Sequence, residues 1–173
     1  MSTLEPLASK YRPKSLDEFI GQQHLVGANG PIRKFLETGN VPSMIFWGPP
    51  GTGKTTLAYI ISLNLYYDFY KMQAVNSGKE ELRKILKIAL NNQKYNRKTM
   101  LFLDEIHRWN KAQQDTLLPY VEKGVITLIG ATTENPSFTI ISPLLSRTKV
   151  FVFNQHTKED IATLLKRVIK KEY

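Results

Sequence analysis

A glycine-rich loop that can bind phosphate begins at Gly48. Residues 48–55 read Gly-Pro-Pro-Gly-Thr-Gly-Lys-Thr, which matches the phosphate-binding pattern of a glycine, four residues, Gly-Lys and a hydroxyl residue. The glycines let backbone amides point at phosphates, Lys54 reaches the outer phosphate oxygens, and Thr55 can ligate Mg²⁺. An apolar run ends at Trp47, and a helix is expected from Thr56. This context favours a site for ATP and Mg²⁺ over a structural turn. The predicted loop residues are Gly48, Pro49, Pro50, Gly51, Thr52, Gly53, Lys54, Thr55 and Thr56.

Two adjacent carboxylates, Asp104 and Glu105, follow the apolar run 100–103. Asp104 is suited to the Mg²⁺ that Thr55 holds, and Glu105 is suited to orient and polarise an attacking water. A buried strand that ends in solvated acids is the simpler interpretation, and the phosphate loop upstream argues against it. Small-molecule kinases exclude water and seldom present such a spare carboxylate. The pair therefore predicts hydrolysis of ATP.

Two further polar positions can complete the site. Asn135 follows the fourth apolar run and can contact the γ-phosphate and the water, with Thr133 as the alternative. Taken alone, Asn135-Pro136 is also a common turn signal. Arg147 follows a short helix start and can reach a neighbouring subunit's phosphates. A surface arginine that caps its own helix explains the same residue equally well.

The elements that must position these residues alternate between strands and helices. Pro31 suits the first position of a helix that Gly39 ends, while Ser77 with Glu80 and Thr157 with Asp160 are capping-box pairs. The alternation predicts an α/β fold, a three-layer αβα core with a five-stranded parallel sheet. In such folds ligands gather at the carboxyl ends of the strands, where the motifs above fall. The predicted strands are 43–47, 70–75, 99–104, 125–131 and 149–153.

Composition narrows the class of protein further. The 173 residues suit one domain, and with no cysteine a disulfide framework is excluded. No stretch has the length and apolarity of a secretory signal or a membrane span, so we expect an intracellular protein without a membrane partner. The formal charge of +9 is compatible with a polyanionic partner. Much of it lies on the helix expected at 157–173, where a solvated face is the favoured interpretation.

Several longer segments resemble one known family. They are 12–13, 16–22, 42–48, Asp-Glu-Ile-His-Arg-Trp-Asn-Lys-Ala-Gln-Gln-Asp at 104–115 and Gly-Ala-Thr-Thr-Glu-Asn-Pro-Ser-Phe at 130–138. Together they resemble replication-associated recombination protein A and its eukaryotic relative, the Werner-helicase-interacting protein. The resemblance covers nearly the whole chain, and the last two segments are the specific ones.

The resemblance implies a P-loop NTPase of the AAA+ class, a DNA-stimulated homo-oligomer that maintains replication forks in repair and recombination. It implies forked or single-stranded DNA as partner, and replication proteins such as single-strand-binding protein or polymerase components. The location would be nucleoid-associated cytoplasm in a bacterium and the nucleus in a eukaryote. Asn135 would be the first sensor and Arg147 the arginine finger. The adenine would be flanked by Arg12, Pro13, Ile20, Gly21 and Gln22.

The same resemblance divides the chain into three parts. Residues 1–30 would be a lead-in that flanks the adenine, 31–155 the ATPase core, and 156–173 the first helix of a truncated helical lid. Two other functions remain open. One is a clamp-loader-like subunit that uses ATP as an assembly switch with little turnover. The other is a superfamily-2 helicase, suggested by residues 104–107 and disfavoured because such helicases need a second domain.

Overall fold

A parallel five-stranded sheet forms the centre of the protein. The computed structural model describes residues 7–172. The strands lie in the order β2-β3-β4-β1-β5, and all four pairings are parallel. Their bounds are β1 (Met44–Trp47), β2 (Asp68–Gln73), β3 (Thr99–Asp104), β4 (Thr127–Thr132) and β5 (Lys149–Val152).

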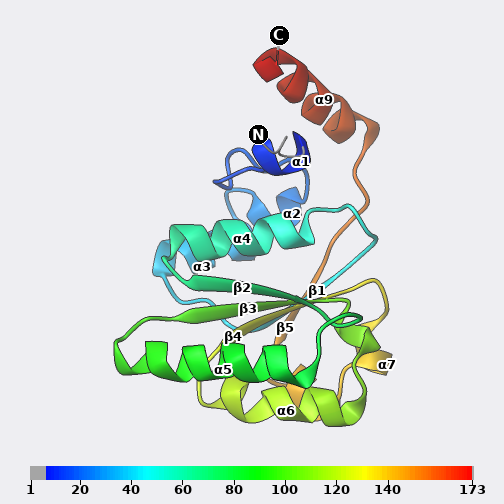
Figure 1. The fold of residues 1–173 in the computed structure, drawn as a ribbon. Helices are drawn as coiled ribbons and strands as arrows, with labels where there is room; N and C mark the ends of the chain where they lie inside the picture. The colour runs from blue at the N-terminus through cyan, green and yellow to red at the C-terminus, as the bar shows by residue number, and fades with distance from the viewer. Residues whose placement is uncertain (1–6, 173) are drawn as a thin grey trace, which may run out of the picture.

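Helices cover both faces of this sheet, as Figure 1 shows. One face carries α1 (Leu7–Lys10), α2 (Gln23–Val26), α3 (Pro31–Thr38) and α4 (Lys54–Asn64). The opposite face carries α5 (Lys79–Lys94) and α6 (Lys111–Glu122). The remaining elements are η1 (Ile106–Arg108), α7 (Pro136–Thr139), α8 (Ser142–Leu145) and α9 (Lys158–Glu172). The predicted three-layer α/β architecture is confirmed.

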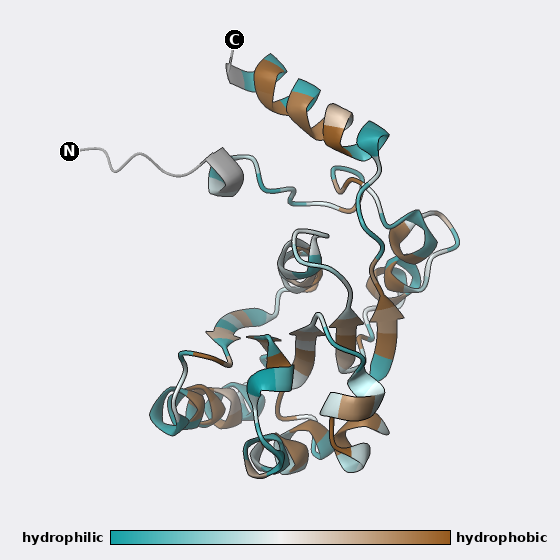
Figure 2. Ribbon diagram, turned by 90° about the vertical axis from the view of Figure 1, so that its right-hand side faces the viewer, coloured by the Kyte–Doolittle hydropathy of each residue, from teal (hydrophilic) through white to brown (hydrophobic). Residues whose placement is uncertain are grey.

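The hydrophobic core is split into two layers by the sheet. In β3, Met100 and Phe102 pack with α4, whereas Leu101 and Leu103 pack with α5 and α6. Alternate side chains of a strand point to opposite faces, so a strand covered on both faces must be apolar at every position. This explains the unbroken apolar run that ends at Asp104. Figure 2 shows the apolar strands, and also apolar positions on α9, where Ile161, Leu165 and Ile169 are exposed.

All five predicted strands are present, but two are misplaced at their ends. β2 begins at Asp68, two residues early, and ends at Gln73, whose carbonyl accepts turn hydrogen bonds from the amides of Asn76 and Ser77. β4 begins only at Thr127, because the amides of residues 125 and 126 both bond back to the carbonyl of Tyr120. Apolar residues in these turns mimic the strand pattern.

Most of the capping residues predicted from the sequence lie at helix ends in the structure. Pro31 begins α3, and Gly39 ends it in the left-handed conformation at φ 70°. Thr157 and Asp160 form the predicted reciprocal bonds at 3.0 and 3.1 Å, and the bond from the Thr157 amide lowers the pKa of Asp160 below its usual value. The Ser77–Glu80 capping box is wrong: Gly78 precedes α5 without a side-chain cap, because the turn after β2 uses the Ser77 amide.

A buried glutamine, Gln114 on α6, joins three segments below the sheet. Its Nε2 donates to the carbonyls of Trp109 and Thr139 at 3.0 and 2.9 Å, and its Oε1 accepts from the Ile141 amide at 2.9 Å. Gln114 therefore connects the segment after β3 with the α7–α8 segment.

Replacing Gln114 by leucine is expected to lower the free energy of unfolding by about 2–4 kcal/mol, because three backbone groups lose their partner. Urea denaturation measures the change. The control is Gln93→Leu, at an exposed position of α5, where a surface change should stay within about 0.5 kcal/mol. Equal stability of the Gln114→Leu variant and the wild type would show that this junction contributes little.

No helix in the described part of the chain has the length and apolarity needed to cross a membrane.

Candidate nucleotide-binding site

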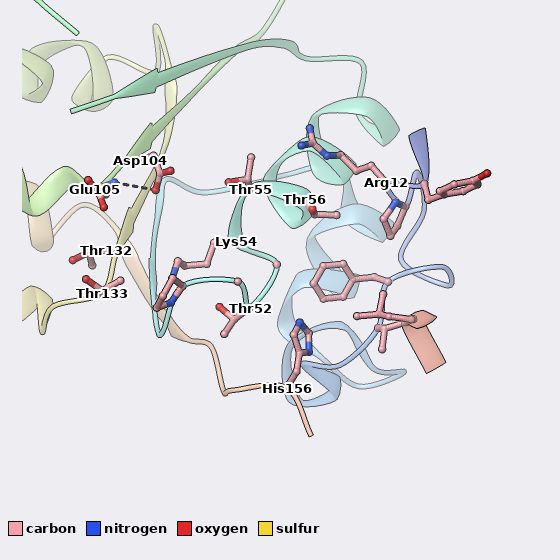
Figure 3. A pocket seen from close by; sticks show the side chains of 18 of the residues that line it. Arg12, Thr52, Lys54, Thr55, Thr56, Asp104, Glu105, Thr132, Thr133 and His156 are labelled. Atoms are coloured by element: carbon pink, nitrogen blue, oxygen red, sulfur yellow. Dashed lines mark hydrogen bonds between the residues drawn. The ribbon is translucent and has the colours of Figure 1, made fainter. Parts of the chain in front are cut away.

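A cavity of ≈ 580 Å³ lies where β1, β3 and β4 end and α4 begins. Figure 3 shows the phosphate-loop side chains and the two carboxylates around it. Seven loop residues line it, namely Pro50, Gly51, Thr52, Gly53, Lys54, Thr55 and Thr56. Across from them lie Asp104, Glu105, Thr132 and Thr133. The topology thus brings together the two motifs that the sequence separates by about fifty residues.

The loop has the backbone that phosphate binding requires. Gly51 and Gly53 adopt left-handed conformations at φ 72° and 97°, which side chains disfavour. A Cβ on Gly53 would also lie 2.7 Å from Phe19 Cζ. The N-terminus of α4 has no side-chain cap, so its first amides are available to an anion, and the helix dipole adds positive potential there.

Lys54, the first residue of α4, places a buried cation at the N-terminus of this helix. Its Nζ donates to the carbonyls of Gly48 and Pro49, the two predicted loop residues that do not line the cavity. Burial lowers the pKa of Lys54, and nearby Asp104 acts in the opposite direction. An ammonium, free amides and one carboxylate pair form a donor set that fits a nucleotide polyphosphate with Mg²⁺.

The chain turns sharply at the end of β3, where the two carboxylates lie. Asp104 ends the strand, and Glu105 is left-handed at φ 54° while its amide donates to Asp104 Oδ1 at 3.0 Å. Such backbone conformations are rare outside glycine and cluster at functional sites. The described residues contain no group of three or more His, Cys, Asp or Glu suited to hold a metal alone. Thr55 and Asp104 would therefore share Mg²⁺ with phosphates and water, as is usual for this ion.

His107 connects the β3 turn with β4. Its Nδ1 lies 2.9 Å from Thr132 Oγ1, and its Nε2 lies 3.9 Å from a Glu134 carboxylate oxygen. The side chain is nearly buried, at 6% exposure. The contact fixes the segment after Glu105 relative to the end of β4.

The two remaining catalytic candidates lie outside the cavity. Asn135 Oδ1 accepts from the Ser137 amide at 3.0 Å and so caps α7, whereas Thr133, the alternative, lines the cavity. Arg147 donates to the Pro143 carbonyl at 3.1 Å and pairs with Glu122 at 2.9 Å. Within a single chain Arg147 therefore caps its own short helix, and its side chain remains 43% exposed.

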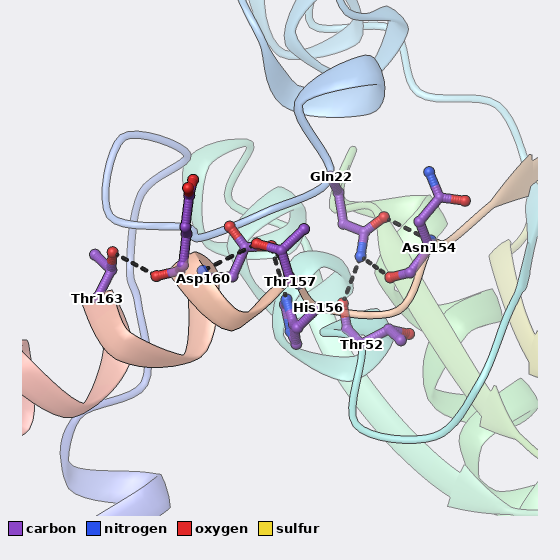
Figure 4. A network of polar contacts seen from close by, with 8 residues as sticks. Gln22, Thr52, Asn154, His156, Thr157, Asp160 and Thr163 are labelled. Carbon is purple, nitrogen blue, oxygen red and sulfur yellow. Dashed lines mark hydrogen bonds and ion pairs between the residues drawn. The ribbon is translucent and has the colours of Figure 1, made fainter.

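The predicted adenine-flanking residues divide into two groups. Arg12, Pro13 and Ile20 line the cavity, while Gly21 and Gln22 do not. Gln22 instead supports the site: its Nε2 donates to the carbonyls of Asn154 and Thr52, and its Oε1 accepts from the Asn154 amide (Figure 4). Gly21 approaches His156, since a Cβ there would lie 2.9 Å from the ring Nδ1.

Sequence reasoning missed the apolar and aromatic wall of this part of the cavity. It consists of Tyr11, Phe19, His156, Leu164 and Val168. The last two come from α9, so both ends of the described chain contribute to one pocket. The aromatic and apolar residue types before Ile20 were the available signal for the first half of the wall.

The chain is similar in sequence to several known proteins. Replication-associated recombination protein A of Escherichia coli K12 is 48% identical over 169 residues, covering 98% of this chain and 38% of that protein. The protein named ATPase WRNIP1 of Dictyostelium discoideum is 47% identical over 165 residues, covering 95% of this chain and 19% of that protein. The chain thus spans less than two-fifths of these relatives.

The fold is also similar to that of solved structures. The Thermotoga maritima RuvB Holliday junction branch migration motor matches with a TM-score of 0.71 and 32% identity, over 91% of this chain and 53% of that chain. The profile of the AAA family, "ATPase family associated with various cellular activities", matches residues 44–156. That span is more than half of the chain and contains the loop, both carboxylates and Thr133, and the protein therefore belongs to the AAA family of ATPases.

Proposed function

We propose that the protein binds ATP with Mg²⁺ in the strand-end cavity and hydrolyses it. The observation that carries this proposal is the meeting of the phosphate loop with Asp104 and Glu105 in one cavity. Bound ATP would supply the electrophilic phosphorus, and Mg²⁺ would neutralise charge on the phosphate oxygens. Lys54 and the α4 amides bind the phosphates, and Thr55 and Asp104 would hold the metal ion. Glu105 orients a water and takes up its proton as the water attacks the outer phosphate and ADP leaves.

The cavity is completed by polar groups at its rim and by a second subunit. Thr133 is the better placed residue to contact the outer phosphate, with Asn135 as the alternative. Arg147, exposed and away from its own cavity, acts on the site of a neighbouring subunit in a homo-oligomer, where it stabilises charge on the transferring group.

We further propose that a lead-in at 1–30 and the first helix of a lid at 156–173 enclose the base, on either side of a core at 31–155. Residues 1–6 and 173 of this division lie outside the residues that the structure describes. Arg12, Pro13 and Ile20 contact it directly, while Gly21 and Gln22 hold the lead-in in place. The residues of α9 that line the cavity support this division. In this interpretation α9 is the first helix of a lid.

The biological role we propose is a DNA-dependent ATPase in replication-fork maintenance, repair and recombination. The names of the similar proteins, which refer to replication-associated recombination, and of the branch migration motor support it. Such a protein would work inside the cell, at the chromosome, with replication proteins such as single-strand-binding protein or polymerase components. The alternative is a clamp-loader-like subunit that uses ATP as an assembly switch with little turnover.

The rate of phosphate release with and without DNA tests this role. With forked or single-stranded DNA the intact protein is expected to release phosphate several times faster than alone, and duplex DNA without ends or gaps serves as the control. Equal rates with every DNA, at saturating ATP, would contradict the DNA-dependent role and favour the switch.

A further inference from the structure

A groove of ≈ 730 Å³, separate from the nucleotide cavity, runs between α5 and α6 on the face of the sheet opposite α4. Figure 1 shows these two helices side by side below the sheet. The end of the groove where α5 and α6 begin, here called its mouth, is lined by the Ser77–Gly78 segment and the Trp109–Asn110 segment. The nucleotide cavity and this groove have no lining residue in common.

Three basic residues of α5 line this groove: Lys79, Arg83 and Lys87. They are spaced four residues apart, so they form one row along the helix, about 12 Å long at a rise of ~1.5 Å per residue. No aspartate or glutamate lines the groove. The row therefore gives the groove a positive potential without a compensating carboxylate on its walls.

The three side chains also lack partners among residues 7–172: the structure records no ion pair or side-chain hydrogen bond for any of them there. By contrast, Arg97 pairs with Asp68 at 2.7 Å and Arg147 pairs with Glu122 at 2.9 Å. Lys79, Arg83 and Lys87 are thus available to neutralise an anionic ligand.

The other walls of the groove combine apolar and hydrogen-bonding residues. Leu82, Leu86 and Trp109 are each only about 5% exposed, so they present little surface to the anchoring side chains that groove-binding peptides use. Leu90, at 43% exposure, and Ala112 are the exposed apolar residues of the groove, and Tyr120 is partly exposed. From α6 the groove receives neutral hydrogen-bonding residues, Gln113 and Thr116, which are suited to sugar and phosphate oxygens.

The mouth of the groove is connected to the catalytic strand ends. The Ser77–Gly78 segment follows β2, and Trp109 follows η1, which begins directly after Glu105. Trp109 Nε1 donates to the Ala74 carbonyl at 3.2 Å, which joins the two segments. A ligand at this mouth would therefore touch residues that continue from the carboxylate proposed to activate water.

We propose that this groove binds the sugar–phosphate backbone of single-stranded DNA, with Lys79, Arg83 and Lys87 as the phosphate contacts. The choice of DNA rests on the proposed function. At a rise of ~1.5 Å per residue, neighbouring cations of the row lie ~6 Å apart along the helix, so each can contact a different phosphate of one strand.

The salt dependence of DNA binding tests the proposal. Each phosphate contact to a single strand contributes ~0.7 to the slope of log K against log salt concentration. Anisotropy of a labelled oligothymidylate is measured on the intact protein from low to high KCl. The double variant Arg83→Ala and Lys87→Ala is expected to bind more weakly than wild type, with a slope reduced by about 1.4.

The matched control is the double variant Lys84→Ala and Lys94→Ala. It removes the same charge from exposed positions of the same helix that do not line the groove, and its slope should remain near the wild-type value. Binding of labelled ATP and thermal unfolding are followed in every sample, and neither should change. Labelled polyglutamate serves as a non-nucleic polyanion, and it should bind wild type and groove variant equally weakly.

The possible outcomes distinguish failure of the groove proposal from failure of the DNA-dependent role. An equal loss in the control pair would show that general charge binds the DNA, and the groove proposal would fall. Groove-dependent binding of polyglutamate, as tight as that of DNA, would instead indicate an acidic protein partner and would also overturn it. If the wild type binds ATP but no DNA, both the groove proposal and the DNA-dependent role are wrong.

Discussion

A Glu105→Gln variant is expected to bind ATP as tightly as the wild type and to release phosphate at least about 100 times more slowly. The substitution keeps the shape of the side chain and removes the charge that polarises water, and general-base groups contribute ~10²–10⁴ to the rate. Lys54, Thr55 and the α4 amides, which would hold the phosphates, are unchanged. Equilibrium binding of a labelled nucleotide and steady-state phosphate release measure the two effects.

Glu81→Gln provides the matched control. Glu81 is an exposed acid of α5, and it lines neither the cavity nor the groove. Its replacement should leave turnover near the wild-type rate. Wild-type turnover by Glu105→Gln would remove Glu105 from the mechanism, whereas loss of binding in this variant would mean that it holds the nucleotide.

An Arg147→Ala variant is expected to retain ATP binding and to lose turnover by about 10³-fold, the lower end of the effect of an arginine finger. The physical reason is the loss of a cation that a neighbouring subunit needs when charge develops on the transferring group. Arg97→Ala is the control, because Arg97 is also an exposed arginine in a surface ion pair and lies away from the cavity.

Mixing experiments show whether Arg147 acts between subunits. Mixed oligomers of Arg147→Ala and Glu105→Gln contain sites in which an intact Glu105 faces an intact Arg147 from the neighbour. Such mixtures should recover turnover that neither variant has alone. If mixing restores nothing, or if Arg147→Ala turns over normally, Arg147 acts only as the helix cap seen in the single chain.

The phosphate site could be predicted from sequence because its signals are local. The loop is a continuous motif, and the apolar run before Asp104 is long enough to require a buried strand. Both parts depend on backbone geometry and burial, which neighbouring residues determine. Strand ends were less predictable, since Val125 and Ile126 are apolar and yet belong to the turn after α6.

The rest of the site depends on contacts between distant parts of the chain. Nothing near Gln22 in sequence indicates that its amide would bridge to Asn154, 132 residues away. Asn135 and Thr133 both follow β4, and only the turn into α7 decides which faces the cavity. The role of Arg147 depends on a second subunit, which no pattern within one chain contains.

Hydrolysis is best tested by phosphate release from the wild-type protein, measured in the same samples as nucleotide binding. We expect that ATP binds, that phosphate release requires Mg²⁺, and that single-stranded or forked DNA accelerates it. Tight binding of ATP that drives assembly, with negligible phosphate release under every DNA condition, would contradict hydrolysis at Glu105 and make the protein a nucleotide-dependent switch.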